Sequence, residues 1–203
     1  MKKKVLASVV LMFLMTSVFV FSDTAQSVLP QLSYKIPEPK LWLKHNDPEI
    51  SLVGPAHYYF NQTEDIDLNI VPIDDDLLTS LNERGEKNFI DDIMRGKNQI
   101  NQMFAAQPSK LVSYKVTNIS ASDRATASEV VQQAGGEGKL LELRLTQVLG
   151  DEEHNILERF FIYPKQAINF QLRSKKSSDP NKVKQAEKLF VQIQPHVRKP
   201  ASK

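Results

Sequence analysis

The second half of the chain alternates apolar and polar residues, and this pattern constrains the fold more than any other feature. Apolar side chains recur with a period of two in three segments, namely Leu141, Leu143 and Leu145, then Ile156, Phe160 and Ile162, then Ile168, Phe170 and Leu172. A period of two is typical of strands. The loops expected at residues 135–138 and 150–155 are short, and short loops join antiparallel neighbours, since parallel strands need a long crossover. With a strand at 111–119 and a candidate partner strand at 125–133, the pattern predicts an antiparallel meander of four or five strands.

The first half of the chain contains a strand followed by a long helix. Ile66, Leu68 and Ile70 alternate with polar residues, which predicts a half-buried strand. A helical pattern then runs to about residue 107 and is ended by Pro108. Four apolar residues share one face of this helix: Phe89, Ile93, Ile100 and Phe104. Gly85 lies inside the pattern, where it is expected to kink or divide the helix.

A second helix closes the chain. Asp179 and Pro180 supply an N-cap and a first-turn proline. The apolar face that follows consists of Val183, Ala186, Phe190 and Ile193. The order of elements is therefore strands, helix, meander and helix. Because one face of each helix and of the sheet must be buried, we expect an α+β fold in which helices pack on a curved antiparallel sheet as an α/β/α-type sandwich.

The first residues are typical of a bacterial secretory signal peptide. Lys2, Lys3 and Lys4 precede an uncharged apolar stretch at residues 5–21. Cleavage is expected after Ser27 or after Ser22. The alternative is an uncleaved inner-membrane anchor, although the stretch is short beside the roughly 20 residues that usually span a bilayer. The expected organisation is a signal peptide at 1–27, a proline-containing linker or lead-in strand at 28–40, one α+β domain at 41–197 and a basic tail at 198–203.

The chain has no cysteine, which excludes disulfides, a thiol nucleophile, a Cys-ligated zinc site and a lipid anchor on cysteine. Its formal net charge is +2. Three lysines and one aspartate lie in the leader, so the mature chain carries equal numbers of basic and acidic residues. A neutral domain argues against nucleic acid as a partner, because that binding depends on neutralising phosphates.

Basic residues are concentrated in residues 173–203. Only Asp179 and Glu187 oppose them there. Such a segment is either a solvated helix face with a tail or a surface for peripheral contact with anionic lipid or with an acidic face of a partner. The basic residues are Arg173, Lys175, Lys176, Lys182, Lys184, Lys188, Arg198, Lys199 and Lys203.

No pattern in the sequence predicts a metal or catalytic site, and no cofactor is expected. The histidines lie in different segments without the close pair that a zinc site usually shows; they are His45, His57, His154 and His196. Two acidic runs are interpreted as helix-start caps and as solvated charges at a hairpin tip. They are Asp74, Asp75 and Asp76, and Asp151, Glu152 and Glu153 beside His154.

Two further clusters are interpreted as structural. The Gly-Gly-Glu-Gly sequence at 135–138 is expected to join two strands, and it lacks the Lys-Ser/Thr of a phosphate-binding loop. The densest aromatic group is expected in the core, with a ligand or partner surface as the alternative. It comprises Trp42, Tyr58 and Tyr59, near His57.

The order and lengths of these elements resemble the PsbP-like superfamily, which includes PsbP, Mog-type and DcrB-like proteins. The resemblance covers roughly residues 40–196. It is carried by the strand at 66–71 that leads into the helix ending near Phe104, by the strands at 111–119, 141–149 and 156–163, and by the closing helix at 183–193. The family's early Gly-Trp is present only as Leu41-Trp42. The resemblance implies the fold and a non-enzymatic, partner-binding role, and it supplies no site residues.

These observations favour an exported, non-catalytic protein of the periplasm or of the secreted fraction that binds a protein partner or an envelope complex. One alternative is a carrier of a small molecule or lipid, with a pocket between helix and sheet. The other is a hydrolase of envelope polymers, for which a pocket with a carboxylate pair or a histidine would be needed.

Overall fold

The computed structural model describes residues 32–44, 56–63, 65–73, 83, 85–103, 107–120, 130–132 and 134–197. The expected signal peptide at 1–27 and the expected basic tail at 198–203 lie outside these residues. So do His45, Phe104 and the acidic run from Asp74 to Asp76.

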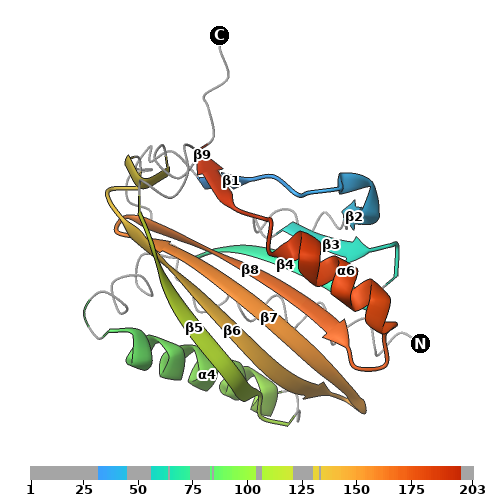
Figure 1. Cartoon of the computed structure of the whole chain (residues 1–203). Helices are drawn as coiled ribbons and strands as arrows, with labels where there is room; N and C mark the ends of the chain where they lie inside the picture. Colours follow the sequence, from blue (N-terminus) through green and yellow to red (C-terminus); the bar gives the residue numbers. More distant parts are fainter. Residues whose placement is uncertain are drawn as a thin grey trace, which may run out of the picture.

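Seven strands form one antiparallel sheet in the order β2-β3-β4-β8-β7-β6-β5 (Figure 1). They are β2 (Trp42–Lys44), β3 (Ala56–Phe60), β4 (Ile66–Ile73), β5 (Lys110–Ile119), β6 (Gly138–Leu149), β7 (Glu152–Tyr163) and β8 (Gln166–Lys175). The last four are neighbours in chain order, so the expected meander is confirmed.

A smaller two-stranded sheet joins the two ends of the described chain. It pairs β1 (Leu32–Tyr34) with β9 (Pro195–Val197), and Leu32 lies opposite Val197. The segment expected as a linker or lead-in strand thus contains a strand. A short 3-10 helix, η1 (Pro39–Leu41), leads from it into β2.

Among the described elements, helices α4 and α6 pack on opposite faces of the large sheet. Helix α4 (Glu86–Met103) buries Phe89 and Ile90 against residues of β6, β7 and β8, among them Phe160. Helix α6 (Pro180–Phe190) buries Ala186, Leu189 and Phe190 on the opposite face. Figure 1 shows the two helices on the two sides of the sheet. The expected α+β fold is confirmed. We call the two sides of the sheet the α4 face and the α6 face.

Strand β7 is buried on both sides, because each face of the sheet has its own core. Ile156 and Phe160 point into the α4 face, whereas Leu157 and Phe161 belong to the core of the α6 face. This explains why apolar residues occur on both faces of β7, since a strand covered on both sides has no solvent-facing side that must be polar.

The first difference from the sequence expectation concerns residues 125–138. Residues 130–132 are helical, so the strand expected at 125–133 is wrong there, and residues 125–129 lie outside the described residues. Val130 and Val131 are buried, and their carbonyls accept hydrogen bonds from the N–H groups of Ala134 and Gly136 at 2.8 Å. Gly135, with a φ of 90°, then ends the turn. The glycine loop therefore joins a helical turn to β6 instead of two strands.

The expected loop at 150–155 is shorter than predicted, because β7 begins at Glu152. Gly150 takes a φ of 63°, which allows a tight turn with Asp151. Gly85, with a φ of 82°, lies between the helical residue Glu83 and the start of α4, so it divides the helical pattern, which is one of the two expected outcomes, and does not kink it. The closing helix ends at Phe190, so Ile193 is a buried residue of the following segment instead of a helix residue.

Candidate functional site

A buried group of polar side chains lies on the α4 face of β3, β4 and β8. At its centre is Asp67, whose Oδ2 accepts a hydrogen bond from Nε of Arg173 at 2.8 Å. Its Oδ1 accepts one from the Asn69 amide at 2.9 Å and lies 3.7 Å from Nε2 of His57. The Asp67 side chain is only 3% exposed. A carboxylate this buried is stable as an ion only when it is paired and hydrogen-bonded, as it is here.

The structure brings two of the four histidines to this group. His57 lies on β3 beside Asp67, and the buried His154 lies on β7 near Arg173. Burial and the positive charge of Arg173 lower the pKa of His154, against a smaller opposing effect of its contact with the Glu152 carbonyl. His154 is therefore not a solvated residue of a hairpin tip, and that expectation is wrong. His196 lies apart, in β9.

A second buried carboxylate ties α4 to the sheet. Glu158 on β7 has no exposed surface, and its Oε1 accepts hydrogen bonds from Lys97 Nζ at 2.7 Å and from the Gln171 amide at 2.5 Å. One turn further along α4, Asn101 donates to the Ser109 hydroxyl at 3.0 Å and accepts from the Gln147 amide at 2.6 Å. Helix α4 is thus packed by apolar contacts in its first half and by hydrogen bonds in its second half.

On the α6 face of the sheet, Arg159 contacts the C-terminal end of α6. Its Nη1 donates to the carbonyls of Val191 at 2.9 Å and Ile193 at 3.0 Å, and its Nε contacts Glu142 at 3.1 Å. Carbonyls just past a helix lack intrahelical partners and carry partial negative charge, which a guanidinium satisfies. Burial lowers the pKa of Arg159, while Glu142 opposes this. Like Lys97 and Asp67, this residue performs a structural task.

The expected aromatic group is divided by the sheet. Trp42 lies in the core of the α6 face, 4.9 Å from Phe60 between ring centroids, and Tyr58 packs against the same core. Tyr59 lies on the other face with His57, at a ring distance of 4.7 Å. These residues therefore do not form one continuous ligand surface.

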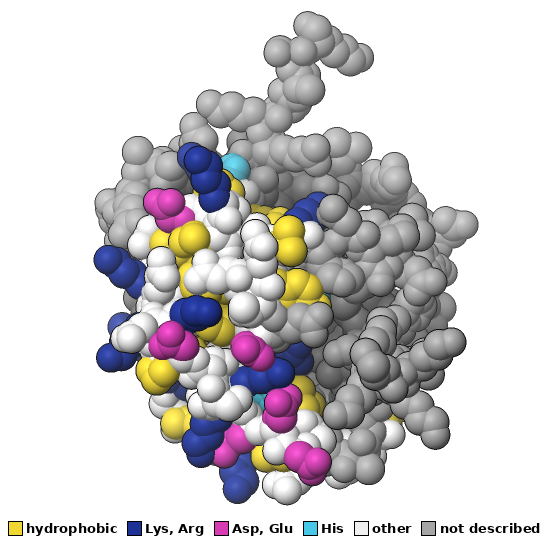
Figure 2. Space-filling view, turned by 90° about the vertical axis from the view of Figure 1, so that its right-hand side faces the viewer, with side chains coloured by type: hydrophobic (Ala, Val, Ile, Leu, Met, Phe, Trp, Pro, Cys, Tyr) yellow, Lys and Arg dark blue, Asp and Glu magenta, His cyan; other side chains and the backbone are white. Residues whose placement is uncertain are grey.

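Ion pairs neutralise the basic segment in part, at its start, where Arg173 pairs with Asp67. Lys175 pairs with Asp65 at 3.1 Å and with Glu152 at 3.3 Å, which together raise its pKa, and Lys176 pairs with Glu153 at 2.8 Å. Figure 2 views the side of the molecule on which α6 lies, and there Lys and Arg side chains are interspersed with Asp and Glu side chains.

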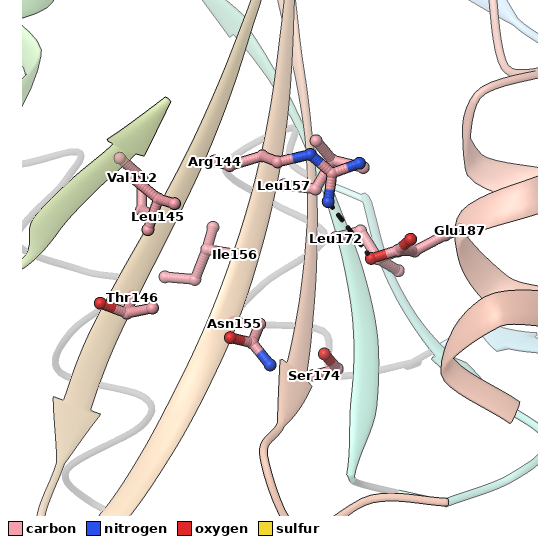
Figure 3. A pocket seen from close by; sticks show the side chains of 10 residues that line it. All are labelled: Val112, Arg144, Leu145, Thr146, Asn155, Ile156, Leu157, Leu172, Ser174 and Glu187. Carbon is pink, nitrogen blue, oxygen red and sulfur yellow. Dashed lines mark ion pairs between the residues drawn. The ribbon is translucent and has the colours of Figure 1, made fainter. Parts of the chain in front are cut away.

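An open pocket lies between α6 and the neighbouring strands (Figure 3). Its volume is about 260 Å³, below the roughly 300–1,000 Å³ that is usual for small-molecule sites. Arg144 Nη1 lies 3.7 Å from Glu187 Oε1 at its edge. The lining contains one carboxylate and no histidine: it comprises Val112, Arg144, Leu145, Thr146, Asn155, Ile156, Leu157, Leu172, Ser174 and Glu187.

In the described part of the chain, no group of three or more His, Asp or Glu side chains is arranged to hold a metal ion. No helix there combines the length and the apolar composition needed to cross a bilayer.

Strand β5 is an exposed edge of the large sheet. It is ten residues long, forms one end of the strand order and pairs only with β6 among the described strands (Figure 1, left-hand edge of the sheet). Neither of its faces is covered over most of its length. Val112 is 62% exposed and Tyr114 is 56% exposed. A long apolar edge strand is a template for pairing with another chain, and proteins usually shorten or cover such edges.

A β-bulge sets the faces of β5. Its register with β6 shifts between Leu111 and Ser113, which leaves Val112 as the extra residue. Lys110 and Lys115, five positions apart, therefore both lie on the α6 face, opposite Thr146 and Glu142. Without the bulge, an odd spacing would place them on opposite faces.

Comparison with solved structures identifies the architecture. The solution structure of the cyanobacterial PsbP protein CyanoP from Synechocystis sp. PCC 6803 matches with a TM-score of 0.50 and 14% identity, over 88% of this chain and 99% of that chain. The chain has a PsbP-like fold. The resemblance drawn from the sequence is therefore confirmed for the fold, which by itself does not determine function.

A second match is the crystal structure of PA94, a protein of unknown function from Pseudomonas aeruginosa. Its TM-score is 0.39 and its identity 11%, over 86% of this chain and 90% of that chain. No protein-family model matches the sequence, and no curated protein matches it significantly.

The sequence analysis missed the polar groups that join α4 to the sheet, although the sequence holds a signal for them. Lys97 and Asn101 follow Phe89 and Ile93 at the same spacing of four. Polar residues that continue a buried helical stripe are candidates for buried hydrogen bonds.

Proposed function

We propose that this chain is an exported, non-catalytic protein of the cell envelope that binds a protein partner along β5. The observation that supports binding is the exposure of a ten-residue edge strand that carries apolar side chains. Export is inferred from the leader at residues 1–27. The sequence contains no recognised catalytic motif, and the buried charged groups hold elements of the fold together. Both observations favour a binding role.

The exposed residues of β5 suit an interface. Leu111, Val112 and Tyr114 lie within four consecutive residues and are 37%, 62% and 56% exposed. Tyrosine is enriched in interfaces because its ring is apolar and its hydroxyl can hydrogen-bond. Contiguous exposed apolar residues on a soluble domain commonly mark a site of association.

The two alternative functions have less support. A lipid or small-molecule carrier needs a mostly apolar cavity, whereas the described pocket is small, open and bordered by an ion pair. A hydrolase needs a pocket with a carboxylate pair or a histidine, and the lining of this pocket has neither.

Site-specific photo-crosslinking tests the proposal. A photoreactive amino acid replaces Val112 on β5 in one variant and Lys184 on α6 in a matched control, because both positions are exposed. The full chain is produced in its own host and irradiated in intact cells. We expect a discrete adduct with one other protein from position 112 and none from position 184. Absence of any adduct from position 112 would refute the proposal, as would the same adduct from both positions.

A further inference from the structure

The backbone of β5 offers hydrogen-bonding groups along its outer edge. In an antiparallel strand, the N–H and C=O groups of alternate residues point to opposite sides. One side of β5 is bonded to β6 over residues 110–119, and among the described strands none lies on the other side. We propose that β5 binds an extended, acidic segment of a partner protein, which adds to the sheet as a further strand. This inference rests on the proposed function.

The positive charge of β5 favours a segment that carries negative charge. The strand contains Lys110 and Lys115 and no acidic residue. Neither lysine forms an ion pair with a described carboxylate, and the register places both on the α6 face. A strand added at the edge would face these lysines across the new pair, where opposite charges attract and like charges repel. Lysines on an edge strand also deter unwanted pairing, so an acidic segment is the one that this edge admits.

The other face of β5 selects apolar residues. Leu111, Tyr114 and Val116 lie opposite Leu145, Leu143 and Leu141 of β6, on the α4 face. Val116 packs against the core there, whereas Leu111 and Tyr114 are exposed. An added strand would cover these two side chains with its own side chains on that face. The expected segment therefore alternates acidic or polar residues with apolar ones.

A second copy of the chain suits this edge poorly. Antiparallel pairing of two β5 strands about a two-fold axis normal to the sheet would gather the lysines of both copies on one face. Like charges close together on one face are destabilising. Self-association through β5 is therefore an outcome that would count against the proposal.

Charge reversal tests the chemistry of the segment. K110E/K115E reverses the charge on β5, and K182E/K184E makes the same change in net charge on exposed positions of α6. With the photoreactive residue at position 112, we expect the adduct yield to fall at least about tenfold in K110E/K115E, because like charges across an interface cost more than the ~1.4 kcal/mol that corresponds to tenfold. The yield should be unchanged in K182E/K184E. Thermal unfolding of each purified variant verifies that it is folded.

A scan of crosslinking positions tests the geometry. Ser113 and Tyr114 are adjacent but lie on opposite faces of β5, since they pair with Arg144 and Leu143. Strand addition places the partner at the edge, so both positions should form the same adduct. An adduct from only one of them would mean docking on a face and would overturn the inference.

The failure of this inference can be distinguished from the failure of the proposed function. If position 112 captures a partner but K110E/K115E captures it equally well, the acidic segment is wrong and partner binding at β5 stands. A β5 adduct that is a dimer of this chain would also overturn the acidic segment. If position 112 captures nothing, the proposed function itself fails.

Discussion

At the scale of single residues, buried charges position the elements of this fold. Arg159 links the end of α6 to the sheet through carbonyls at 2.9 and 3.0 Å and through Glu142. Asp67 links β4 to Arg173 of β8, and Glu158 links β7 to Lys97 of α4. Removing one partner of such a group leaves the other buried and unsatisfied, which costs more than the bond itself contributes.

Replacing Arg159 with methionine should lower the free energy of unfolding by about 2–4 kcal/mol, because Glu142 and the carbonyls after α6 lose a charged donor. Lys182→Met is the matched control: it removes a cation from an exposed position of α6 and should change stability by less than about 0.5 kcal/mol. Urea denaturation of the two variants measures the difference. Equal stabilities would show that the contacts of Arg159 contribute nothing.

His154 should make stability depend on pH. Its folded-state pKa is lowered by burial and by Arg173, so the unfolded chain binds the proton more tightly. The resulting stabilisation is complete above the unfolded pKa of about 6.5 and decreases as the pH falls below it. Between pH 7 and pH 5, the free energy of unfolding should therefore fall less steeply in His154→Gln than in the natural chain. Parallel curves from denaturation at several pH values would contradict this.

The sequence predicts the buried apolar residues better than the buried polar ones. Phe89 and Ile93 follow from a helical period alone. The partner of Lys97 is Glu158, 61 positions away, and no local pattern indicates that the two meet. The same is true of Asp67 and Arg173, which are 106 positions apart and adjacent only because β4 pairs with β8.

At the scale of elements, the strands of the meander could be predicted because a period of two determines which face of each is buried. The expected secondary structure was wrong where the residue types of a segment fit more than one structure. Val130 and Val131 favour a strand by type, yet burial and the glycine turn at residue 135 place them in a helical turn. Glu152 to Asn155 resemble a polar loop by composition, but pairing with β6 and β8 makes them strand residues. The exposure of β5 could not be predicted, because it depends on which strand ends the sheet.

Alanine substitution at two glycines, one closely surrounded and one not, tests how tightly the elements pack. A Cβ at Gly138, at the start of β6, would lie 2.5 Å from the Ile162 carbonyl oxygen, so Gly138→Ala should destabilise the fold by about 1–3 kcal/mol. Gly96, inside α4, has no atom within 4 Å of such a Cβ, so Gly96→Ala should stabilise it by about 0.5–1 kcal/mol. Melting temperatures that shift in opposite directions would agree with this, and a shift in the same direction would not.

At the scale of the whole molecule, the two ends of the described chain lie together in the PsbP-like fold. β1 pairs with β9, so the first and the last described strands lie side by side. Helices cover both faces of the sheet, and β5 remains exposed at the end of its strand order. Partner binding through an edge would leave both cores undisturbed, which suits a protein whose buried charges are already used for packing.

The proposed cleavage of a signal peptide leaves the described fold intact. The first described strand begins at Leu32, so cleavage after Ser22 or after Ser27 leaves every described strand intact. The intact mass of the protein recovered from the periplasm or medium should correspond to a start at Asp23 or Val28. A mass that retains Met1, recovered with membranes, would instead show an uncleaved anchor.

The central claim is that β5 binds the partner. Hydrogen–deuterium exchange of the chain alone, and of the chain with its captured partner, tests this claim most directly. Among the backbone amides at residues 110–119, those that point away from β6 should exchange rapidly in the free chain and become protected in the complex, while the amides of α6 exchange equally in both. Unchanged exchange at 110–119, with new protection elsewhere, would contradict the account.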